Sequence, residues 1–253
     1  IWMIFNVIIW TMGLWHLGKI IAWPPRGWRR YALFTLTTFS FAWITWRYEQ
    51  VGILVFVMFI ALILSIRNQD WLGTGIWLAL LLVKPNITLI AVAGISLWLI
   101  RNGQWRAVLL MLLTLVILLS ISTVITPDWF QPFAEAGFGQ GLKVALDGPN
   151  QVVAVRINTT FLDWLRVLGL ESQFHGVIYG IAIGIGVFVF LWCVYRSRSL
   201  LELISILLLL SYAITPYSLQ YDFPPLIIVL FWALSRCASS PKALAVGLLL
   251  SGF

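Results

Sequence analysis

Two long stretches without a charged residue constrain this chain more than any other feature of its sequence. Ala107–Pro127 contains 21 residues and Ser172–Tyr195 contains 24, and neither includes an Asp, Glu, Lys or Arg. About 20 apolar residues in a helix are enough to cross the roughly 30 Å hydrocarbon core of a bilayer. The whole chain is 61% hydrophobic and only 10% charged, which excludes a soluble globular fold. The sequence therefore predicts an all-α polytopic membrane protein.

Apolar segments recur along the chain, and short polar junctions separate them. We expect a helical bundle of about nine or ten transmembrane or re-entrant segments. The segment 71–83 is short, about 20 Å at 1.5 Å per residue, so it either spans a thinned region or re-enters. A single helix over 71–100 is rejected, because it would invert every later loop. The expected segments are 1–22, 31–46, 51–66, 71–83, 87–100, 107–126, 176–195, 201–214, 223–236 and 243–253.

One long polar loop divides what we expect to be a single membrane domain. Residues 1–126 form N-terminal membrane segments, 127–175 an extracytoplasmic loop, and 176–253 the C-terminal membrane segments. Within the loop, Thr160–Asp163 is a possible capping box, and Gly169 would end the helix that it opens. We expect this short amphipathic helix to lie in the outer interface.

The charges predict the orientation of the chain in the membrane. If the segments alternate sides, one set of junctions carries 11 basic and 2 acidic residues, and the other carries 5 basic and 7 acidic residues. Basic residues accumulate on the cytoplasmic side, so the first set is predicted to be cytoplasmic. The net charge of +7 is thus a signal of topology and does not indicate a nucleic-acid partner. Cys193 and Cys237 are expected to pack in apolar segments and imply neither a disulfide nor a metal site.

Three polar junctions, all on the predicted outer side, are candidates for chemistry. They are Arg47–Gln50, Lys84–Asn86 and Thr215–Asp222. A proline-broken polar junction between apolar segments is a place where a membrane protein can hold a reactive group at the bilayer boundary. Whether the second and third junctions face each other is the central structural question.

Each candidate also has a purely structural interpretation. Lys84 would complement the negative end of helix 71–83, and Asn86 would cap the next helix. Asp222 would cap a helix that starts at Pro224-Pro225. Arg47 and Glu49 would form a local pair, His175 would be an interfacial hydrogen-bonding residue, and Tyr217 and Tyr221 would anchor the chain at the interface.

The order of these motifs resembles that of glycosyltransferase family 87. The motifs are Glu49-Gln50-Val51-Gly52, Lys84-Pro85-Asn86 after a short apolar segment, the long outer loop, and Thr215-Pro216-Tyr217-Ser218 with Tyr221-Asp222. The resemblance covers about residues 45–235. That family comprises GT-C-type membrane enzymes, including mannosyltransferases that use polyprenyl phosphate mannose. Glu49 and Gly52 replace its usual Gly and Asn, and Tyr221-Asp222 stands where some members have His-His.

The resemblance implies a function and a set of site residues. The enzyme would move a hexose, by analogy mannose, from a polyprenyl phosphate to a lipid-linked or cell-envelope glycan on the extracytoplasmic side of a bacterial plasma membrane. No cofactor, metal or nucleic acid is implied. Lys84, Arg47 and Arg156 would bind the donor phosphate. The sugar and the acceptor would be bound by Glu49, Gln50, Asn86, His175, Tyr217, Ser218, Tyr221 and Asp222.

The resemblance leaves the general base outside this sequence. In such enzymes an acidic residue of the first outer loop takes the proton of the acceptor hydroxyl. That loop would precede Ile1, so we expect the chain to be truncated at its N-terminus. Inversion at the anomeric carbon follows by analogy with the family.

Two other classes of function compete with this hypothesis. A transporter or lipid flippase would place ionisable residues deep within helices and would have matching broken segments in related halves. Only His16 and Lys19 approach the first condition, and the two broken junctions differ in sequence. In a structural membrane subunit, Lys84 and Asp222 would tolerate substitution.

Overall fold

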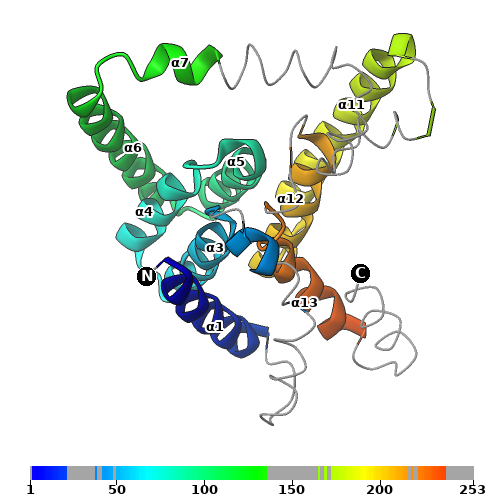
Figure 1. The fold of residues 1–253 in the computed structure, drawn as a ribbon. Helices are drawn as coiled ribbons and strands as arrows, with labels where there is room; N and C mark the ends of the chain where they lie inside the picture. Colours follow the sequence, from blue (N-terminus) through cyan, green and yellow to red (C-terminus); the bar gives the residue numbers. More distant parts are fainter. Residues whose placement is uncertain are drawn as a thin grey trace.

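The computed structural model describes residues 2–21, 38, 42–47, 50–135, 165, 168–169, 172–215, 218 and 222–237. All regular structure in these ranges is helical, which confirms the predicted class of an all-α membrane protein. Apart from the short α7, the helices pack side by side as a bundle (Figure 1). They are α1 (Trp2–Ile21), α3 (Gly52–Arg67), α4 (Trp71–Leu81), α5 (Pro85–Arg101), α6 (Trp105–Ile125), α7 (Phe130–Ala134), α11 (Ser172–Arg196), α12 (Leu200–Ile214) and α13 (Leu226–Cys237).

The predicted segments and the observed helices agree wherever the structure describes the chain. Eight of the ten expected segments correspond to helices whose ends differ from the prediction by a few residues. The segment 31–46 is described only at residues 38 and 42–46, which are helical, and 243–253 lies outside the described residues. α4 and α5 are separate helices, so the rejected single helix over 71–100 is not formed.

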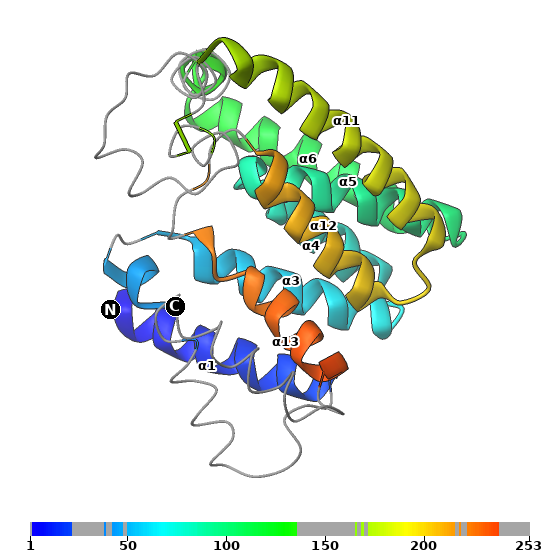
Figure 2. The same cartoon turned by 90° about the vertical axis from the view of Figure 1, so that its right-hand side faces the viewer.

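Helix length varies strongly within the bundle. α1, α6 and α11 are long and apolar enough to cross a membrane, whereas α4 has only 11 residues, about 16 Å. α4 and α6 run in the same direction and meet where Gly75 lies against Leu110. From this contact α4 continues for six residues and α6 for fifteen (Figure 2). The end of α4 therefore lies well short of the end of α6.

Small residues permit the closest helix contacts, as is common within membranes. A methyl group at Gly75 would lie 2.6 Å from Leu110 Cβ and 2.9 Å from the carbonyl oxygen of Ala107. At Gly94, in α5, it would lie 2.5 Å from Leu207 of α12. These two contacts join α4 to α6 and α5 to α12.

Arginines tie helix ends together at one end of the bundle. The Arg67 guanidinium donates two hydrogen bonds, of 3.3 and 3.2 Å, to the carbonyl of Ile20 at the end of α1. Arg101, at the end of α5, donates a 2.8 Å bond to the carbonyl of Val194 in the last turns of α11. Several basic residues predicted to be cytoplasmic thus lie at one end, although the side of the membrane stays a prediction.

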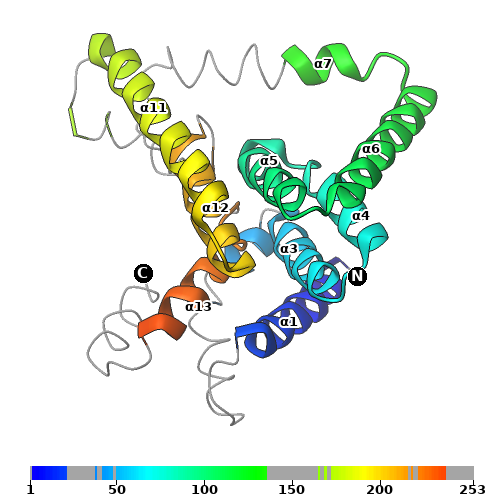
Figure 3. The same ribbon diagram turned by 180° about the vertical axis from the view of Figure 1, so that it is seen from behind.

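The outer loop is described in part, and the three-part division of the chain stays a prediction. α7, at its start, was not predicted (Figure 3). Of the expected amphipathic helix, Leu165 is helical and buried against Tyr179. Gly169 has a φ of 73°, the left-handed conformation that suits the end of a helix. The rest of that helix lies outside the described residues.

Candidate active site

The first half of the site is the junction between α4 and α5. The backbone N–H groups of Leu82 and Val83 each donate a 3.1 Å bond to the carbonyl three residues earlier, so α4 ends in a tightened turn. Pro85 has no N–H and disfavours a helical conformation at Lys84, which has φ −129° and ψ 67°. The Thr88 hydroxyl lies 2.6 Å from the carbonyl oxygen of Leu81 and 2.9 Å from that of Lys84. It therefore ties the end of α4 to the start of α5.

This geometry corrects two structural interpretations of the junction. Lys84, and not Asn86, is the N-cap residue of α5, and its side chain makes no capping hydrogen bond. The reason is that Pro85 suits the first helical position, which starts the helix earlier than an Asn86 cap would allow. The Lys84 side chain forms a salt bridge with Asp222, so it does not serve α4 as a C-terminal charge alone.

The second half of the site is the junction between α12 and α13. α12 ends at Ile214, and the N–H of Thr215 still donates a 2.9 Å bond to Ser211. α13 begins at Leu226, so the interpretation of Asp222 as its N-cap is wrong. Pro224 and Pro225 lie in a turn just before α13. The N–H of Leu226 donates a 2.8 Å hydrogen bond to the backbone carbonyl of Phe223.

Tyr212 of α12 contacts the α12–α13 junction through its hydroxyl and its ring. The Tyr212 hydroxyl donates a hydrogen bond to the backbone carbonyl of Asp222. The Tyr212 ring also packs edge-to-face on Phe223, with 5.9 Å between the ring centroids. The backbone of Asp222 is therefore fixed relative to α12, although nine residues separate it from Tyr212.

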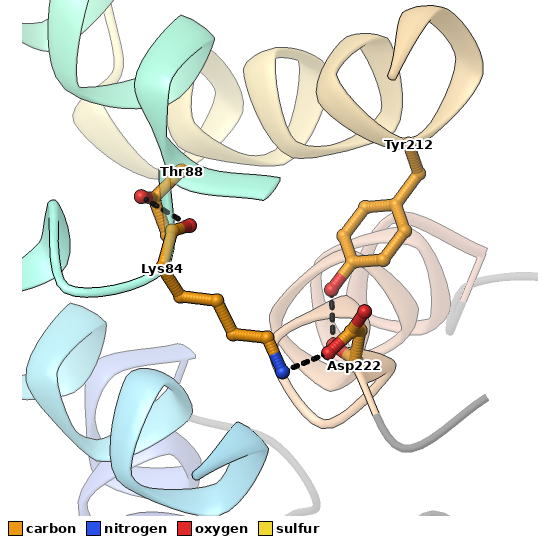
Figure 4. A network of polar contacts seen from close by, with 4 residues as sticks. All are labelled: Lys84, Thr88, Tyr212 and Asp222. Carbon is orange, nitrogen blue, oxygen red and sulfur yellow. Dashed lines mark hydrogen bonds and ion pairs between the residues drawn. The ribbon is translucent and has the colours of Figure 1, made fainter. Parts of the chain in front are cut away.

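The two junctions meet in a salt bridge between the Lys84 ammonium and the Asp222 carboxylate (Figure 4). The Asp222 side chain is 0% exposed, and the Lys84 side chain is 13% exposed. Removing either charge from such a pair leaves the other buried without compensation, which costs several kcal/mol. The structure thus brings together two predicted site residues that lie 138 positions apart in the sequence, one from each half of the bundle.

The other predicted site residues are placed only in part. Asn86 is half-buried in the first turn of α5, and Ser218 is buried near Asp222 in sequence. Arg47 is exposed at the end of helical residues 42–47, and the N–H of Gln50 donates a 3.1 Å bond to Thr45. His175 is buried in the first turns of α11. Glu49, Arg156, Tyr217 and Tyr221 lie outside the described residues.

Sequence reasoning missed Thr88 and Tyr212, which fix the backbones of the two charged residues. Thr88 lies four residues after Lys84, the spacing at which a hydroxyl reaches back to a carbonyl in a helix, so this signal was present. Tyr212 lies in an apolar run, where a phenol is usually interpreted as packing. Its contact depends on how the chain turns after α12, which no local pattern predicts.

The fold and the salt bridge define a polytopic helical membrane protein with a buried ionic site between two helix junctions. The family model of glycosyltransferase family 87 matches residues 1–216. Because the match covers most of the chain, the protein belongs to glycosyltransferase family 87 and is a membrane glycosyltransferase. Lys84 lies within the matched range, and Asp222 lies six residues beyond it. Comparisons with the curated proteins and with the solved structures gave no significant match.

Proposed function

We propose that this glycosyltransferase moves a hexose, with mannose as the first choice, from a polyprenyl phosphate to a lipid-linked or cell-envelope glycan. The transfer would take place on the extracytoplasmic side of a bacterial plasma membrane. The observation that carries this proposal is the Lys84 ammonium, held in a salt bridge with Asp222 at a helix junction within the membrane domain. A cation in that position suits the phosphate of a lipid-linked sugar.

The reaction forms one bond and breaks one bond at the anomeric carbon of the sugar. The acceptor oxygen attacks this carbon, and the bond from the carbon to the phosphate oxygen breaks, with its electron pair remaining on the polyprenyl phosphate. The acceptor proton would go to a carboxylate that acts as the general base. The departing phosphate gains negative charge, and the Lys84 ammonium would stabilise it.

The surroundings of Lys84 favour a lipid-linked donor over a soluble one. α4 ends short of α6, so Lys84 lies below the level that the longest helices reach. Val83 and Leu89, on either side of the junction in sequence, are exposed apolar side chains. A polyprenyl chain would lie along such apolar surface while its phosphate reaches the ammonium.

The remaining assignments of the proposal rest on the sequence. Arg47 and Arg156 would supply further positive charge for the donor phosphate. The residues expected to bind the sugar and the acceptor keep that assignment. The charge bias between the two sets of junctions supports the outer side, and the absence of a divalent metal from the reaction is part of the proposal.

A transfer assay with a matched control tests the proposal. The full-length protein in proteoliposomes would receive radiolabelled polyprenyl phosphate mannose and a membrane glycolipid extract as acceptor. We expect Lys84→Gln to lower kcat by about 100-fold or more, because one electrostatic stabiliser of the leaving group is lost. Arg101→Gln, at the other end of the same helix, should change it by less than about threefold.

Three outcomes would contradict parts of this proposal. Full transfer by Lys84→Gln would remove Lys84 from the active site. Transfer from a nucleotide sugar, with none from polyprenyl phosphate sugars, would exclude the proposed donor class. Transfer only when donor and acceptor face the cytoplasmic leaflet would reverse the proposed sidedness.

A further inference from the structure

We propose that one end of the bundle, where α5, α6 and α11 meet, binds an anionic phospholipid. The head group would contact Arg106 and Arg196, and the acyl chains would lie on the exposed face of α5 between α6 and α11. This site lies at the opposite end of α5 from Lys84. The inference goes beyond the proposed sugar transfer and does not depend on it.

The first observation is that three helix ends lie together. Arg101, the last residue of α5, donates a 2.8 Å hydrogen bond to the carbonyl of Val194 in the last turn of α11. The indole nitrogen of Trp98 donates one of 3.3 Å to the carbonyl of Ser197, the residue after α11. α6 begins at Trp105, after a turn of three residues. The end of α5, the start of α6 and the end of α11 therefore share one region of the bundle.

The second observation is the positive charge of this region. Arg101, Arg106, Arg196 and Arg198 are all exposed, and the acidic residue that accompanies them is Glu202 in the first turn of α12. None of the four arginines forms an ion pair with another described residue. Arg101 uses its guanidinium for backbone carbonyls, but those of Arg106 and Arg196 donate no hydrogen bond within the described part of the chain. A guanidinium binds phosphate oxygens in pairs, which suits the head group of a phospholipid.

The third observation is that α5 lies between α6 and α11 and packs against both (Figures 1 and 3). On one side the Ser96 hydroxyl lies 3.6 Å from the sulfur of Met111 in α6. On the other side a methyl group at Gly94 would lie 3.0 Å from the Phe190 ring of α11. These two contacts fix which part of the α5 surface the neighbouring helices leave uncovered.

The uncovered part of α5 is an apolar stripe. Its members, spaced by four, four and three residues, are exposed and lie on one face of the helix; they are Leu89, Ala93, Leu97 and Ile100. On a helical wheel this face lies between Ser96 and Gly94, and therefore between α6 and α11. Leu97 and Ile100 are the members nearest the arginines and are 44% and 48% exposed. The stripe thus leads directly to the positively charged end.

The surroundings favour a lipid over a soluble anion. α6 and α11 are both long and apolar enough to cross a membrane, so their ends lie at the level of the head groups. Trp105 and Tyr195 are exposed at these ends, and the Arg106 guanidinium lies 5.9 Å from the centre of the Trp105 ring. Exposed aromatic rings beside basic residues are typical of the membrane interface. In a bilayer acyl chains must cover the α5 stripe, and the arginines select the lipid whose head group carries a net negative charge.

Native mass spectrometry of the full-length protein tests this selection. The protein in neutral detergent would receive dioleoyl phosphatidylglycerol or dioleoyl phosphatidylcholine, which differ in head-group charge and share their acyl chains. We expect one retained phosphatidylglycerol, held at least fivefold more tightly than phosphatidylcholine. Arg106→Gln/Arg196→Gln should lower the retention of phosphatidylglycerol by about tenfold. Arg236→Gln, which removes an exposed cation at the end of α13, is the matched control and should change it by less than about twofold.

A second pair of variants tests the apolar half of the site. Leu97→Ala/Ile100→Ala should lower the retention of phosphatidylglycerol by about threefold, because less apolar surface contacts the acyl chains. Val124→Ala/Ile125→Ala, which alters exposed residues at the far end of α6, should leave it unchanged. Thermal unfolding provides an independent measurement. Phosphatidylglycerol should raise the Tm of the wild-type protein by a few degrees and leave that of Arg106→Gln/Arg196→Gln unchanged.

Three results would overturn the inference. Equal retention of the two lipids would show that the arginines do not select an anionic head group. Equal losses in Arg106→Gln/Arg196→Gln and Arg236→Gln would show that the charge acts without a defined site. Displacement of phosphatidylglycerol by an equal concentration of sn-glycerol 3-phosphate would show a site for a soluble phosphate. These assays measure lipid binding only, so a failure of the proposed sugar transfer would leave their outcome unchanged.

Discussion

The two ends of α5 both carry a cation, but they hold it in opposite ways. At the start of the helix, Lys84 pairs with a fully buried carboxylate that comes from another helix junction. At its end, Arg101 is exposed and donates hydrogen bonds to the backbone carbonyls of Val194 and Tyr195. Its guanidinium also lies over the Tyr195 ring, 5.3 Å from the ring centroid.

This difference separates an anchor from a candidate binding group. A guanidinium at the C-terminal end of α11 satisfies carbonyls that lack an intrahelical partner, and it interacts favourably with the helix dipole. It stabilises the end of the bundle without needing a counter-charge. Lys84 lies in a less exposed place, and its ammonium needs Asp222 as a counter-charge.

The largest effect expected from this comparison is on stability. Asp222→Asn or Lys84→Gln should each destabilise the protein by about 3–5 kcal/mol, because the remaining charge loses its partner. The double variant Lys84→Gln/Asp222→Asn should recover much of this loss, while Arg101→Gln should cost about 1 kcal/mol. Thermal unfolding of the detergent-solubilised protein, followed by tryptophan fluorescence, would rank the variants by their loss of stability. Equal losses of stability for Lys84→Gln and Arg101→Gln would contradict the proposed difference between the cations at the two ends of α5.

The next effect concerns the packing that sets the position of the lysine junction. Gly75→Ala should destabilise the protein by about 1–3 kcal/mol, since the new methyl group would meet α6 backbone atoms and Leu110 at 2.6–2.9 Å. Gly184→Ala in α11 is the matched control, because no atom lies within 4 Å of the added methyl group. Thermal unfolding would compare the two variants. A Gly75→Ala variant as stable as Gly184→Ala would contradict the close approach of α4 to α6.

A smaller effect is expected from the hydroxyl that fixes the Lys84 turn. Thr88→Val keeps the side-chain shape and removes the hydrogen bonds to Leu81 and Lys84, at a cost of about 1 kcal/mol. Thr114→Val removes a 2.8 Å bond within α6 only, where the carbonyl of Leu110 already has a helical partner. Its cost should be below about 0.5 kcal/mol by the same unfolding assay. Equal costs would show that the Thr88 bonds have no special role in the junction.

The smallest expected effect is at the arginine end. Arg101→Lys keeps the charge and loses the planar guanidinium, so it should cost about 0.5 kcal/mol and leave sugar transfer unchanged. The same unfolding and transfer assays would measure both. A strong loss of transfer in Arg101→Lys would show that the arginine end also takes part in the reaction.

Much of the fold could be predicted from the sequence because the membrane simplifies the problem. A chain in hydrocarbon must satisfy its backbone groups internally, so apolar segments of sufficient length become helices. The break between α4 and α5 was predictable from Lys84-Pro85, since proline ends a preceding helix. The start of α5 was missed by two residues because Asn86 suggested a cap. α7 was missed because five residues give no usable periodicity.

The candidate site was predictable as a set of junctions but not as contacts. Lys84 and Asp222 stood out because each is a charged residue between apolar segments. A charge in that position raises the free energy of the folded protein unless it has a partner, so it often marks a functional site. Their pairing depends on how the α4–α5 and α12–α13 turns approach each other across 138 positions. Tyr212 gave no signal, because its hydrogen bond is made to a backbone carbonyl that becomes its neighbour only after the turn.

The amino-acid sequence by itself determined the membrane class, most helix boundaries and the family, because apolar length, proline breaks and motif order are local features of the chain. The tertiary structure alone decided that the Lys84 and Asp222 junctions meet, that the Asp222 side chain is the more deeply buried of the two, and that Thr88 and Tyr212 hold the two turns. The physical reason is that these contacts depend on helix packing through small residues such as Gly75 and Gly94. Such packing is set by all the helices together, and no single stretch of sequence contains it.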